Sequence, residues 1–424
     1  MIYSRFLFVA TLLLLLSNQS KAQDKKYAKF LIDTLAADGM LGRGYVKKGD
    51  LLAANFISSE FEKNKVQKVG KSYFQPFNLS VNTFQGEILI KIDNKDLIPG
   101  VDFMLHPESK SAAGVYTLNF PPVKVFEDSL SFLDFASNET DFSKTVFVID
   151  LDQSAQKNKM NFFINRLNGM NIGGIIFLTT GNLTWFVGKN VLTFPVILAK
   201  NESIPKNQKL VLMNFSNQFL PDYQSQNVIG FLPSTEKNDS ILIFSAHYDH
   251  LGKMGRLATY NGANDNASGT AMMLDLAKSY AKQKKRKYNI YFIAFGGEEA
   301  GLVGSNFLAD NPKFELSKIT KMINLDLMGF GEDGIMVVNG NENPNFVNAL
   351  KSINEKENFT TEVKSRPNAA NSDHYPFAKK GVKAIFIYTM GNSKYYHDIN
   401  DRPETLELNS YEKIYSLIYQ FAEL

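Results

Sequence analysis

Cysteine is absent from this chain of 424 residues, which excludes disulfide bonds, cysteine nucleophiles and thiolate metal ligands. Excess charge is nearly absent as well, because 46 Lys and Arg residues stand against 43 Asp and Glu residues. A formal net charge of +3 argues against nucleic acid or an anionic membrane as the partner. After the first residues, no apolar run reaches the length of a transmembrane helix, so we expect no stable membrane anchor.

The N-terminal residues have the pattern of a secretory signal peptide, residues 1–22. A short basic start, Met1–Arg5, precedes an apolar core, Phe6–Leu16, and Ser20-Lys-Ala22 supplies the small residues that a signal peptidase recognises. The apolar core of about 11 residues is too short to span a bilayer comfortably, which disfavours the alternative of a membrane anchor. We therefore predict cleavage near Ala22 and a secreted or periplasmic protein.

Residues 23–85 are predicted to begin the main domain. Helical periodicity extends from Lys26 to about Lys71 and is interrupted by a loop at Gly42–Tyr45. Alternating apolar residues over Phe74–Phe84 then predict a strand.

Residues 86–222 have a different pattern, because short β-type runs recur around a single predicted helix, Lys157–Asn168. This segment is predicted to be a small β-rich or α/β accessory domain inserted into the main domain. Its one histidine, His106, is expected at the surface.

Residues 223–424 alternate strongly between strand and helix patterns. Ile241–Ala246 and Ile290–Phe295 are typical of buried strands, whereas Ala267–Gln283 and Ser410–Glu423 have helical periodicity. The alternation predicts an α/β domain with a mixed, largely parallel sheet flanked by helices. Four of the five histidines lie in this part, all near predicted strand ends: His247, His250, His374 and His397.

The first two polar clusters follow the strand Ile241–Ala246. His247 and Asp249 are two residues apart, so an extended chain places them on one face, where one can bind a metal while the other fixes its tautomer. Asp265 lies in a loop rich in glycine and asparagine, residues 262–269, just before a helical pattern. Each cluster alone also fits a structural role, since a strand-end histidine is often hydrogen-bonded and an aspartate can cap a helix.

Three further clusters follow later strands. Glu298 and Glu299 come directly after a strand, and because adjacent side chains cannot both face one point, one can bind metal while the other holds a water. The alternative for this pair is an acidic helix start. Asp326 ends an apolar run and needs a partner there. His397 lies in the loop 395–402, after the last predicted strand.

Together, these clusters predict a metal centre at the strand ends. Two imidazoles and three carboxylates form a ligand set that suits zinc. Charge supports two ions, because two Zn²⁺ and a bridging hydroxide would neutralise the carboxylates of Asp265, Glu299 and Asp326. The predicted cofactor is therefore two Zn²⁺.

The motifs His-x-Asp, Asn-Asp-Asn-Ala-Ser-Gly, Glu-Glu, Asn-Leu-Asp and Tyr-His occur in this order within residues 226–405. In this respect the chain resembles the two-zinc exopeptidase family of secreted bacterial leucyl aminopeptidases and glutamate carboxypeptidases. A weaker similarity covers Leu35–Phe61, including Gly42-Arg-Gly44. The middle segment resembles a protease-associated (PA) domain through its β-type runs and Phe194-Pro-Val-Ile197. The resemblance implies a zinc-exopeptidase, phosphorylase/hydrolase-like fold with this domain inserted.

The resemblance implies a role for each metal ligand. One zinc would be held by His247 and Asp326, and the other by Glu299 and His397. Asp265 would bridge the two ions.

It also implies the groups that would act on the substrate. Glu298 would be the general base on the bridging water, and Asp249 would orient His247. Tyr396 would either stabilise the oxyanion or pack as an ordinary aromatic residue. The family further implies a cis peptide bond after Asp265. Asp373 and His374 resemble a motif near the family's substrate pocket.

The predicted function is a metal-dependent aminopeptidase that hydrolyses N-terminal residues from peptides through a zinc-activated water. A carboxypeptidase of the glutamate carboxypeptidase type uses the same metal ligands, and a glutaminyl-cyclase-like enzyme shares the fold with a single zinc, so both are alternatives. In a third alternative the chain is a binding module whose accessory domain captures a partner and whose metal site is vestigial. The complete ligand set argues against that alternative.

Overall fold

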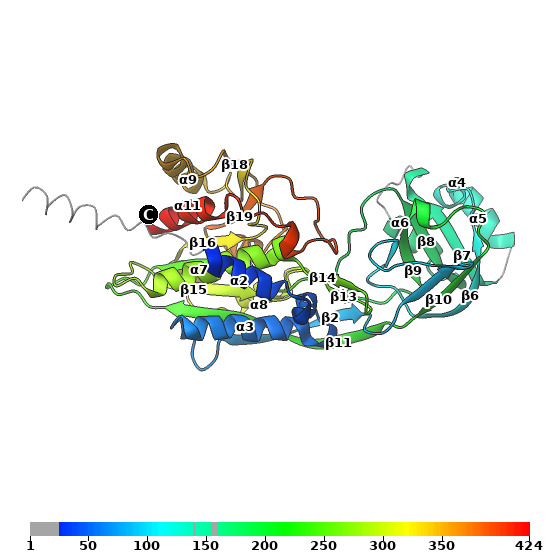
Figure 1. Ribbon diagram of the computed structural model, residues 1–424, viewed down its shortest axis with the longest axis horizontal. Coiled ribbons are helices and arrows are strands. Elements are labelled where there is room, and N and C mark those ends of the chain that lie inside the picture. Colours follow the sequence, from blue (N-terminus) through cyan, green and yellow to red (C-terminus); the bar gives the residue numbers. More distant parts are fainter. Residues whose placement is uncertain (1–24, 139–140, 154–159) are drawn as a thin grey trace, which may run out of the picture.

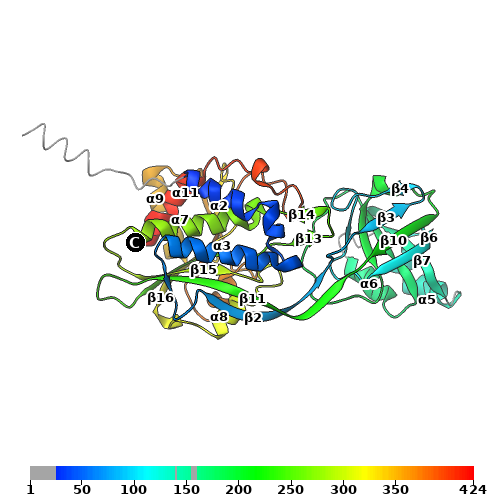
Figure 2. The same cartoon turned by 60° about the horizontal axis from the view of Figure 1, so that its bottom comes forward.

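The computed structural model describes residues 25–138, 141–153 and 160–424, so the predicted signal peptide lies outside the described residues. The described residues form two lobes, each with its own sheet and its own apolar core (Figure 1). The long strands β2 (Phe74–Thr83) and β11 (Gln218–Leu232) pair with each other and run from one lobe towards the other (Figure 2). We call the nine-stranded sheet the first sheet and the eight-stranded sheet the second sheet.

The first sheet has the strand order β1-β11-β15-β12-β16-β19-β17-β18, with β2 paired to β11. Its centre is parallel and consists of β15 (Asn289–Phe295), β12 (Ile241–His247), β16 (Ile319–Leu325) and β19 (Ala384–Met390). Towards the edges the pairing becomes antiparallel, between β11 and β15 and between β17 (Gly334–Val338) and β19; β18 (Val363–Arg366) then pairs parallel with β17. The predicted mixed α/β sheet is therefore confirmed.

Helices cover both faces of the first sheet because its central strands are apolar on both sides. Along β12, Leu242 and Phe244 face one core, whereas Ile241 and Ile243 face the other, as the two-residue period of a strand requires. The first face is covered by α2 (Lys25–Leu35), α3 (Gly49–Lys63), α7 (Gly269–Ala281), α9 (Pro344–Glu357) and α11 (Tyr411–Glu423). The opposite face is covered by α8 (Val303–Asp310) and α10 (His374–Lys379).

The helical pattern that we predicted to continue to about Lys71 ends earlier. Helix α3 ends at Lys63, and β1 (Gln67–Lys68) then pairs with β11 at the edge of the first sheet. Edge pairing therefore overrides the local helical periodicity in this segment.

The second sheet is made by residues between Leu89 and Phe215, in the order β4-β3-β10-β6-β7-β8-β9-β5. Its strands are β3 (Leu89–Ile92), β4 (Lys95–Asp96), β5 (Phe103–Leu105), β6 (Ala112–Asn119), β7 (Phe142–Asp150), β8 (Ile172–Thr179), β9 (Val196–Lys200) and β10 (Leu210–Phe215). Helices α4 (Lys124–Glu127), α5 (Ser129–Asn138) and α6 (Met160–Leu167) accompany it. The predicted start of the last helix lies partly outside the described residues.

The expectation that His106 lies at the surface is wrong, because the residue is 6% exposed. Its ring contacts Phe186 edge-on, with the ring centroids 5.4 Å apart, and its Nδ1 accepts a hydrogen bond from the Glu108 N–H at 3.2 Å. Local sequence does not reveal this burial, because Phe186 lies far from His106 along the chain.

The two lobes meet at a small hairpin, β13 (Gly252–Met254) and β14 (Ala258–Tyr260). Met254, Ala258 and Tyr260 belong to the apolar core of the second sheet, although the hairpin lies between residues of the predicted metal centre in sequence. Within the described part of the chain, no helix is both long and apolar enough to cross a bilayer.

Candidate metal centre

Three neighbouring central strands of the first sheet end at the same edge. β12 ends at His247 with β15 on one side and β16 on the other, and Glu298, Glu299 and Asp326 come shortly after these neighbours. The chain passes from β12 to β15 on one side and then to β16 on the other. Such a switch point is where open α/β sheets bind their ligands.

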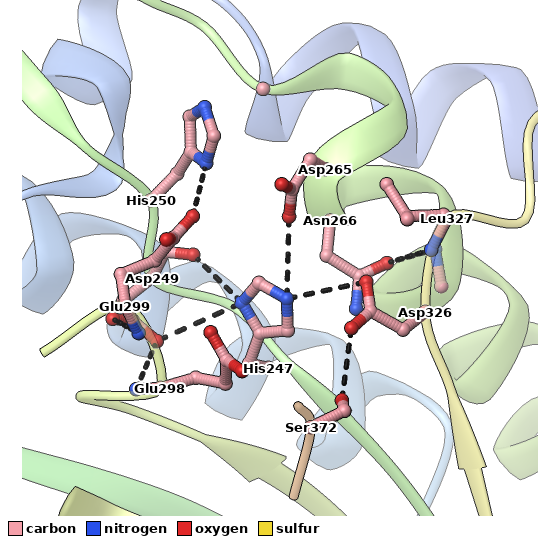
Figure 3. Close-up of polar contacts among 12 residues, drawn as sticks. His247, Asp249, His250, Asp265, Asn266, Glu298, Glu299, Asp326, Leu327 and Ser372 are labelled. Atoms are coloured by element: carbon pink, nitrogen blue, oxygen red, sulfur yellow. Dashed lines mark hydrogen bonds and ion pairs between the residues drawn. The ribbon is translucent and has the colours of Figure 1, made fainter. Parts of the chain in front are cut away.

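The five side chains predicted to bind metal lie in contact with one another (Figure 3 shows His247, Asp265, Glu299 and Asp326). Nε2 of His247 is 3.3 Å from Oδ1 of Asp265 and 3.3 Å from Oδ1 of Asp326. Nε2 of His397 is 3.2 Å from Oδ2 of Asp265 and 3.3 Å from Oε2 of Glu299. Asp265 therefore lies between two pairs of side chains and directs one carboxylate oxygen to each histidine.

These distances match the separation of ligands around zinc. Zinc binds nitrogen and oxygen at about 2.0–2.1 Å, and two ligands of a tetrahedral ion are then about 3.3 Å apart. His247, Asp265 and Glu299 also place ligand atoms within 4.8 Å of one another. The donor set and its spacing therefore fit a zinc centre.

Asp265 is held by its backbone as well as by its neighbours. Its N–H and that of Asn264 donate to the two carboxylate oxygens of Asp401 at 3.0 and 2.8 Å. The peptide bond between Asp265 and Asn266 is cis, as the family resemblance implied. The Asn266 amide then joins the loop to neighbouring segments, because it donates to the Leu325 carbonyl at 3.0 Å and accepts from Gly269 N–H at 2.9 Å.

Asp249 acts through two different groups. Its main-chain carbonyl lies 3.1 Å from Nδ1 of His247, whereas its carboxylate is 3.9 Å from that atom. The carboxylate instead accepts hydrogen bonds from the N–H groups of Glu298 and Glu299, at 3.1 and 3.3 Å, and from the Tyr45 hydroxyl at 3.0 Å. The carbonyl of Asp249 therefore orients His247, and its side chain positions the backbone of the two glutamates.

The predicted metal cluster concentrates charged side chains in a largely buried site. Burial, together with the nearby carboxylates, raises the pKa of Glu298 well above its ordinary value. For Asp265, burial alone would raise the pKa, but hydrogen bonds with His247 and His397 hold it well below the ordinary value. For His247, burial alone would lower the pKa, but Asp326 and Glu298 hold it well above the ordinary value. Buried carboxylates that lie close together repel one another, and a bound cation compensates their charge.

A cavity opens beside the cluster. Its lining combines four of the five predicted ligands with Glu298, Tyr396 and further residues of β18, β19 and nearby loops: Leu327, Arg366, Asn371, Phe386 and Tyr388. Tyr396 is 54% exposed, and its ring stacks on His397 with centroids 3.9 Å apart. Asp373 and His374 are fully buried and do not belong to the lining of this cavity. Burial raises the pKa of Asp373 to about 7.

Arg43 supports the centre but was not singled out as a site residue. It is fully buried, and burial lowers its pKa to about 10. Its guanidinium donates to five main-chain carbonyls, those of Leu35, Tyr248, Asn261, Gly262 and Asp265, at 2.6–3.1 Å. Arg43 therefore ties the N-terminal helix to both sides of the loop that carries Asp265.

The glycine before Arg43 is the sequence signal that could have indicated this role. Gly42 has a φ of +63°, and a Cβ there would lie 2.4 Å from the Tyr260 carbonyl oxygen. Glycine is therefore required for the close approach of this segment to the hairpin β13–β14.

Two more residues of the site were not predicted. Nδ1 of His250 lies 2.8 Å from Oε1 of Glu299, and the Ser372 hydroxyl donates to Oδ2 of Asp326 at 2.9 Å (Figure 3). The other carboxylate oxygen of Glu299 faces His397, and that of Asp326 faces His247. His250 and Ser372 therefore fix the orientation of these two predicted ligands.

Comparisons with known proteins find similar sequences and similar folds. Residues 227–422 match the model of peptidase family M28. The aminopeptidase YwaD of Bacillus subtilis (strain 168) is 32% identical over 232 residues, which cover 51% of this chain and 48% of that protein. A probable leucine aminopeptidase of Trichophyton verrucosum (strain HKI 0517) is 28% identical over 205 residues, covering 45% and 54%. The chain thus spans about half the length of these curated relatives.

Solved structures share the fold over nearly the whole chain. BSAP, a zinc aminopeptidase from Bacillus subtilis, superimposes with a TM-score of 0.71 at 22% identity, covering 93% of this chain and 94% of that one. A peptidase M28 precursor from Shewanella amazonensis SB2B gives a TM-score of 0.70 at 17% identity, covering 95% and 93%.

Proposed function

We propose that this chain is a zinc-dependent aminopeptidase that removes N-terminal residues from peptides, a proposal supported by the match of residues 227–422 to the model of peptidase family M28. The spacing of the ligand atoms carries the proposal. His247 and His397 each lie 3.2–3.3 Å from two carboxylates, and Asp265 is shared between them. Two adjacent zinc ions with a bridging carboxylate would produce this arrangement.

The chain's own residues would hold the two ions in the predicted way. His247 and Asp326 would bind one, Glu299 and His397 the other, with Asp265 between them. Bound zinc would supply a water of lowered pKa and an electrophile for the peptide carbonyl.

Glu298 is the proposed general base. It lines the cavity, is partly buried, and has a pKa well above the ordinary value because of burial and the neighbouring acids. A carboxylate in such a place favours binding a proton, so it can take one from the attacking water and pass it to the leaving amine. Tyr396 lines the same cavity, and its hydroxyl is the proposed donor to the oxyanion.

We further propose that residues 86–222 are an accessory domain of the PA type, inserted between the parts 23–85 and 223–424 of the peptidase domain. Export of the chain, with cleavage near Ala22, is also part of the proposal. The peptide is the proposed substrate.

A panel of peptides blocked at one end or the other tests the proposed activity. We expect hydrolysis of peptides with a free N-terminus whether or not the C-terminus is amidated, and no hydrolysis of N-acetylated peptides. A chelator should abolish the activity, and zinc should restore it with two ions per chain. Cleavage of N-acetylated peptides that requires a free C-terminus would instead indicate a carboxypeptidase, and full activity with one ion a glutaminyl-cyclase-like enzyme. Hydrolysis that resists the chelator would refute the proposal.

A further inference from the structure

A cationic side chain lies on the wall of the cavity beside the metal cluster. Arg366, the last residue of β18, lines the same cavity as His247, Glu298 and Asp326. The cavity has a volume of about 190 Å³. This is many times the volume of about 10–15 Å³ that one water molecule needs on the same measure, so an amino-acid side chain fits there.

The register of the sheet places Arg366 well away from the metal ligands. Arg366 pairs with Val338 on β17, and Val338 pairs with Phe386 on β19. β19 in turn pairs with β16, the strand that leads to Asp326. Neighbouring strands are about 4.8 Å apart, so β18 lies about 14 Å from β16. The strand that carries Arg366 is therefore separated from β16 by β17 and β19, although Arg366 lines the same cavity as the metal cluster.

Two neighbours fix the orientation of the guanidinium. Cζ of Arg366 lies 5.4 Å from the centre of the Tyr388 ring. With the amide of Asn371 assigned so that its nitrogen donates to the Ala369 carbonyl at 3.0 Å, its oxygen accepts from Nη2 of Arg366 at 2.6 Å. The cation is thus preorganised, and less side-chain entropy is lost when a ligand binds.

No acidic residue within the described ranges forms an ion pair with Arg366, and its Nε has no hydrogen-bond partner there. Arg43 differs, because its donors are occupied by main-chain carbonyls. Burying a guanidinium partly without a counter-ion costs free energy, and binding an anion reduces this cost. Its fork of N–H donors matches a carboxylate in particular.

We propose that Arg366 binds a carboxylate of the peptide substrate, so that the enzyme prefers substrates with a negative charge next to the scissile bond. This inference rests on the proposed peptidase function. Leu327, Phe386 and Tyr388 provide apolar walls for the carbon atoms that carry the carboxylate. The carboxylate is either the side chain of an N-terminal Asp or Glu or the free C-terminus of a dipeptide.

Two matched substrate pairs distinguish these sources. The p-nitroanilides of Glu and Gln differ only in the side-chain charge and have no C-terminal carboxylate. Leu-Ala and Leu-Ala amide differ only at the C-terminus. For the wild-type protein we expect the charged member of one pair to have the higher kcat/KM.

In the variant Arg366→Met we expect that preference to fall by about 10- to 100-fold, the range of hydrogen bonds to a charged group. Lys364→Met, at an exposed position of the same strand, is the matched control and should retain the preference. Zinc content and thermal unfolding of both variants verify the fold. An equal ratio of kcat/KM in the wild type and in Arg366→Met, for both pairs, would overturn the inference.

A different experimental result is expected if the proposed peptidase function is wrong. If no substrate is hydrolysed, the peptidase proposal fails, whereas calorimetry of the zinc-loaded protein with glutamate against glutamine, and with leucine against leucinamide, still tests Arg366. Tighter binding of the charged member of either pair, lost in Arg366→Met, supports the inference. Equal binding within both pairs contradicts it.

Discussion

The two sheets of this molecule differ in the partners of the acidic residues that follow their parallel strands. In the second sheet, Asp150 ends β7 and its carboxylate lies 3.7 Å from the Lys206 ammonium. In the first sheet, Asp265, Glu299 and Asp326 gather around two histidines, and within the described ranges no Lys or Arg forms an ion pair with them. The nearby cation, Arg43, is bonded to carbonyls instead. The carboxylate of Asp150 therefore has a lysine to balance its charge, whereas the clustered acids of the first sheet need a bound cation for this purpose.

The largest expected effect comes from substituting the two adjacent glutamates of the first sheet. Glu298→Gln should keep its zinc but lose turnover by about 10²–10⁴-fold, because the proton acceptor is removed and the ligand set is not. Glu299→Gln should lose zinc as well, since its carboxylate lies 3.3 Å from His397 and 2.8 Å from His250. Steady-state kcat and zinc per chain, measured on each variant, separate the two roles.

Asp150→Asn is the control from the second sheet and should change neither turnover nor zinc content. If Glu298→Gln loses zinc while Glu299→Gln remains active, the two assignments must be exchanged. If Asp150→Asn also loses zinc, the contrast between the two sheets is wrong.

The sequence predicted the metal cluster because four of the five ligands follow a strand that its own apolar run reveals, whereas Asp265 was indicated by its loop rich in glycine and asparagine. His247, Glu299 and Asp326 end up together since parallel neighbours finish at one edge of the sheet. Arg43 could not be predicted in the same way, because its acceptors at Tyr248, Asn261, Gly262 and Asp265 lie more than 200 positions along the chain. Strand β18 was missed as well, since Val363–Arg366 is short and half of it is exposed.

The lobe of the second sheet contains a histidine, His106, that makes its stability depend on pH, whereas the lobe of the first sheet contains the candidate metal centre. Burial lowers the pKa of His106 to about 4, whereas an unfolded histidine titrates near 6.5. The unfolded chain therefore binds the proton first, so the stability linked to neutral His106 is complete above about pH 6.5 and is lost as the pH falls towards 4. This loss amounts to about 3 kcal/mol.

His106→Gln removes this contribution to the pH dependence. Between pH 7 and pH 4, the free energy of unfolding of the second lobe should fall by about 3 kcal/mol less in the variant than in the wild type. Urea denaturation followed by the fluorescence of the single tryptophan, Trp185, reports on this lobe. An identical pH dependence in the two proteins would show that His106 can be protonated in the folded state at little cost.

The smallest effect is expected where the two lobes meet, at Trp185. Its ring stacks on Tyr260 with centroids 4.8 Å apart, and its indole N–H donates to the Leu105 carbonyl at 2.9 Å. Its main-chain N–H donates to the carbonyl of His397 at 3.1 Å. The second lobe therefore contacts the backbone of a predicted zinc ligand directly, through a residue anchored in its own core.

Trp185→Leu keeps an apolar side chain but removes the stack and the indole hydrogen bond, so the loop of His397 should be less well fixed. We expect zinc affinity to fall about tenfold, the lower end of the range for groups that orient a ligand. Competition with a coloured chelator measures this change. Phe163→Leu, in the core of the second sheet at α6, is the matched control, because it destabilises the same lobe without touching the joint. Weaker zinc binding in Trp185→Leu alone means that the second lobe positions the metal loop; equal binding in both variants means that the first sheet holds its metal centre without that support.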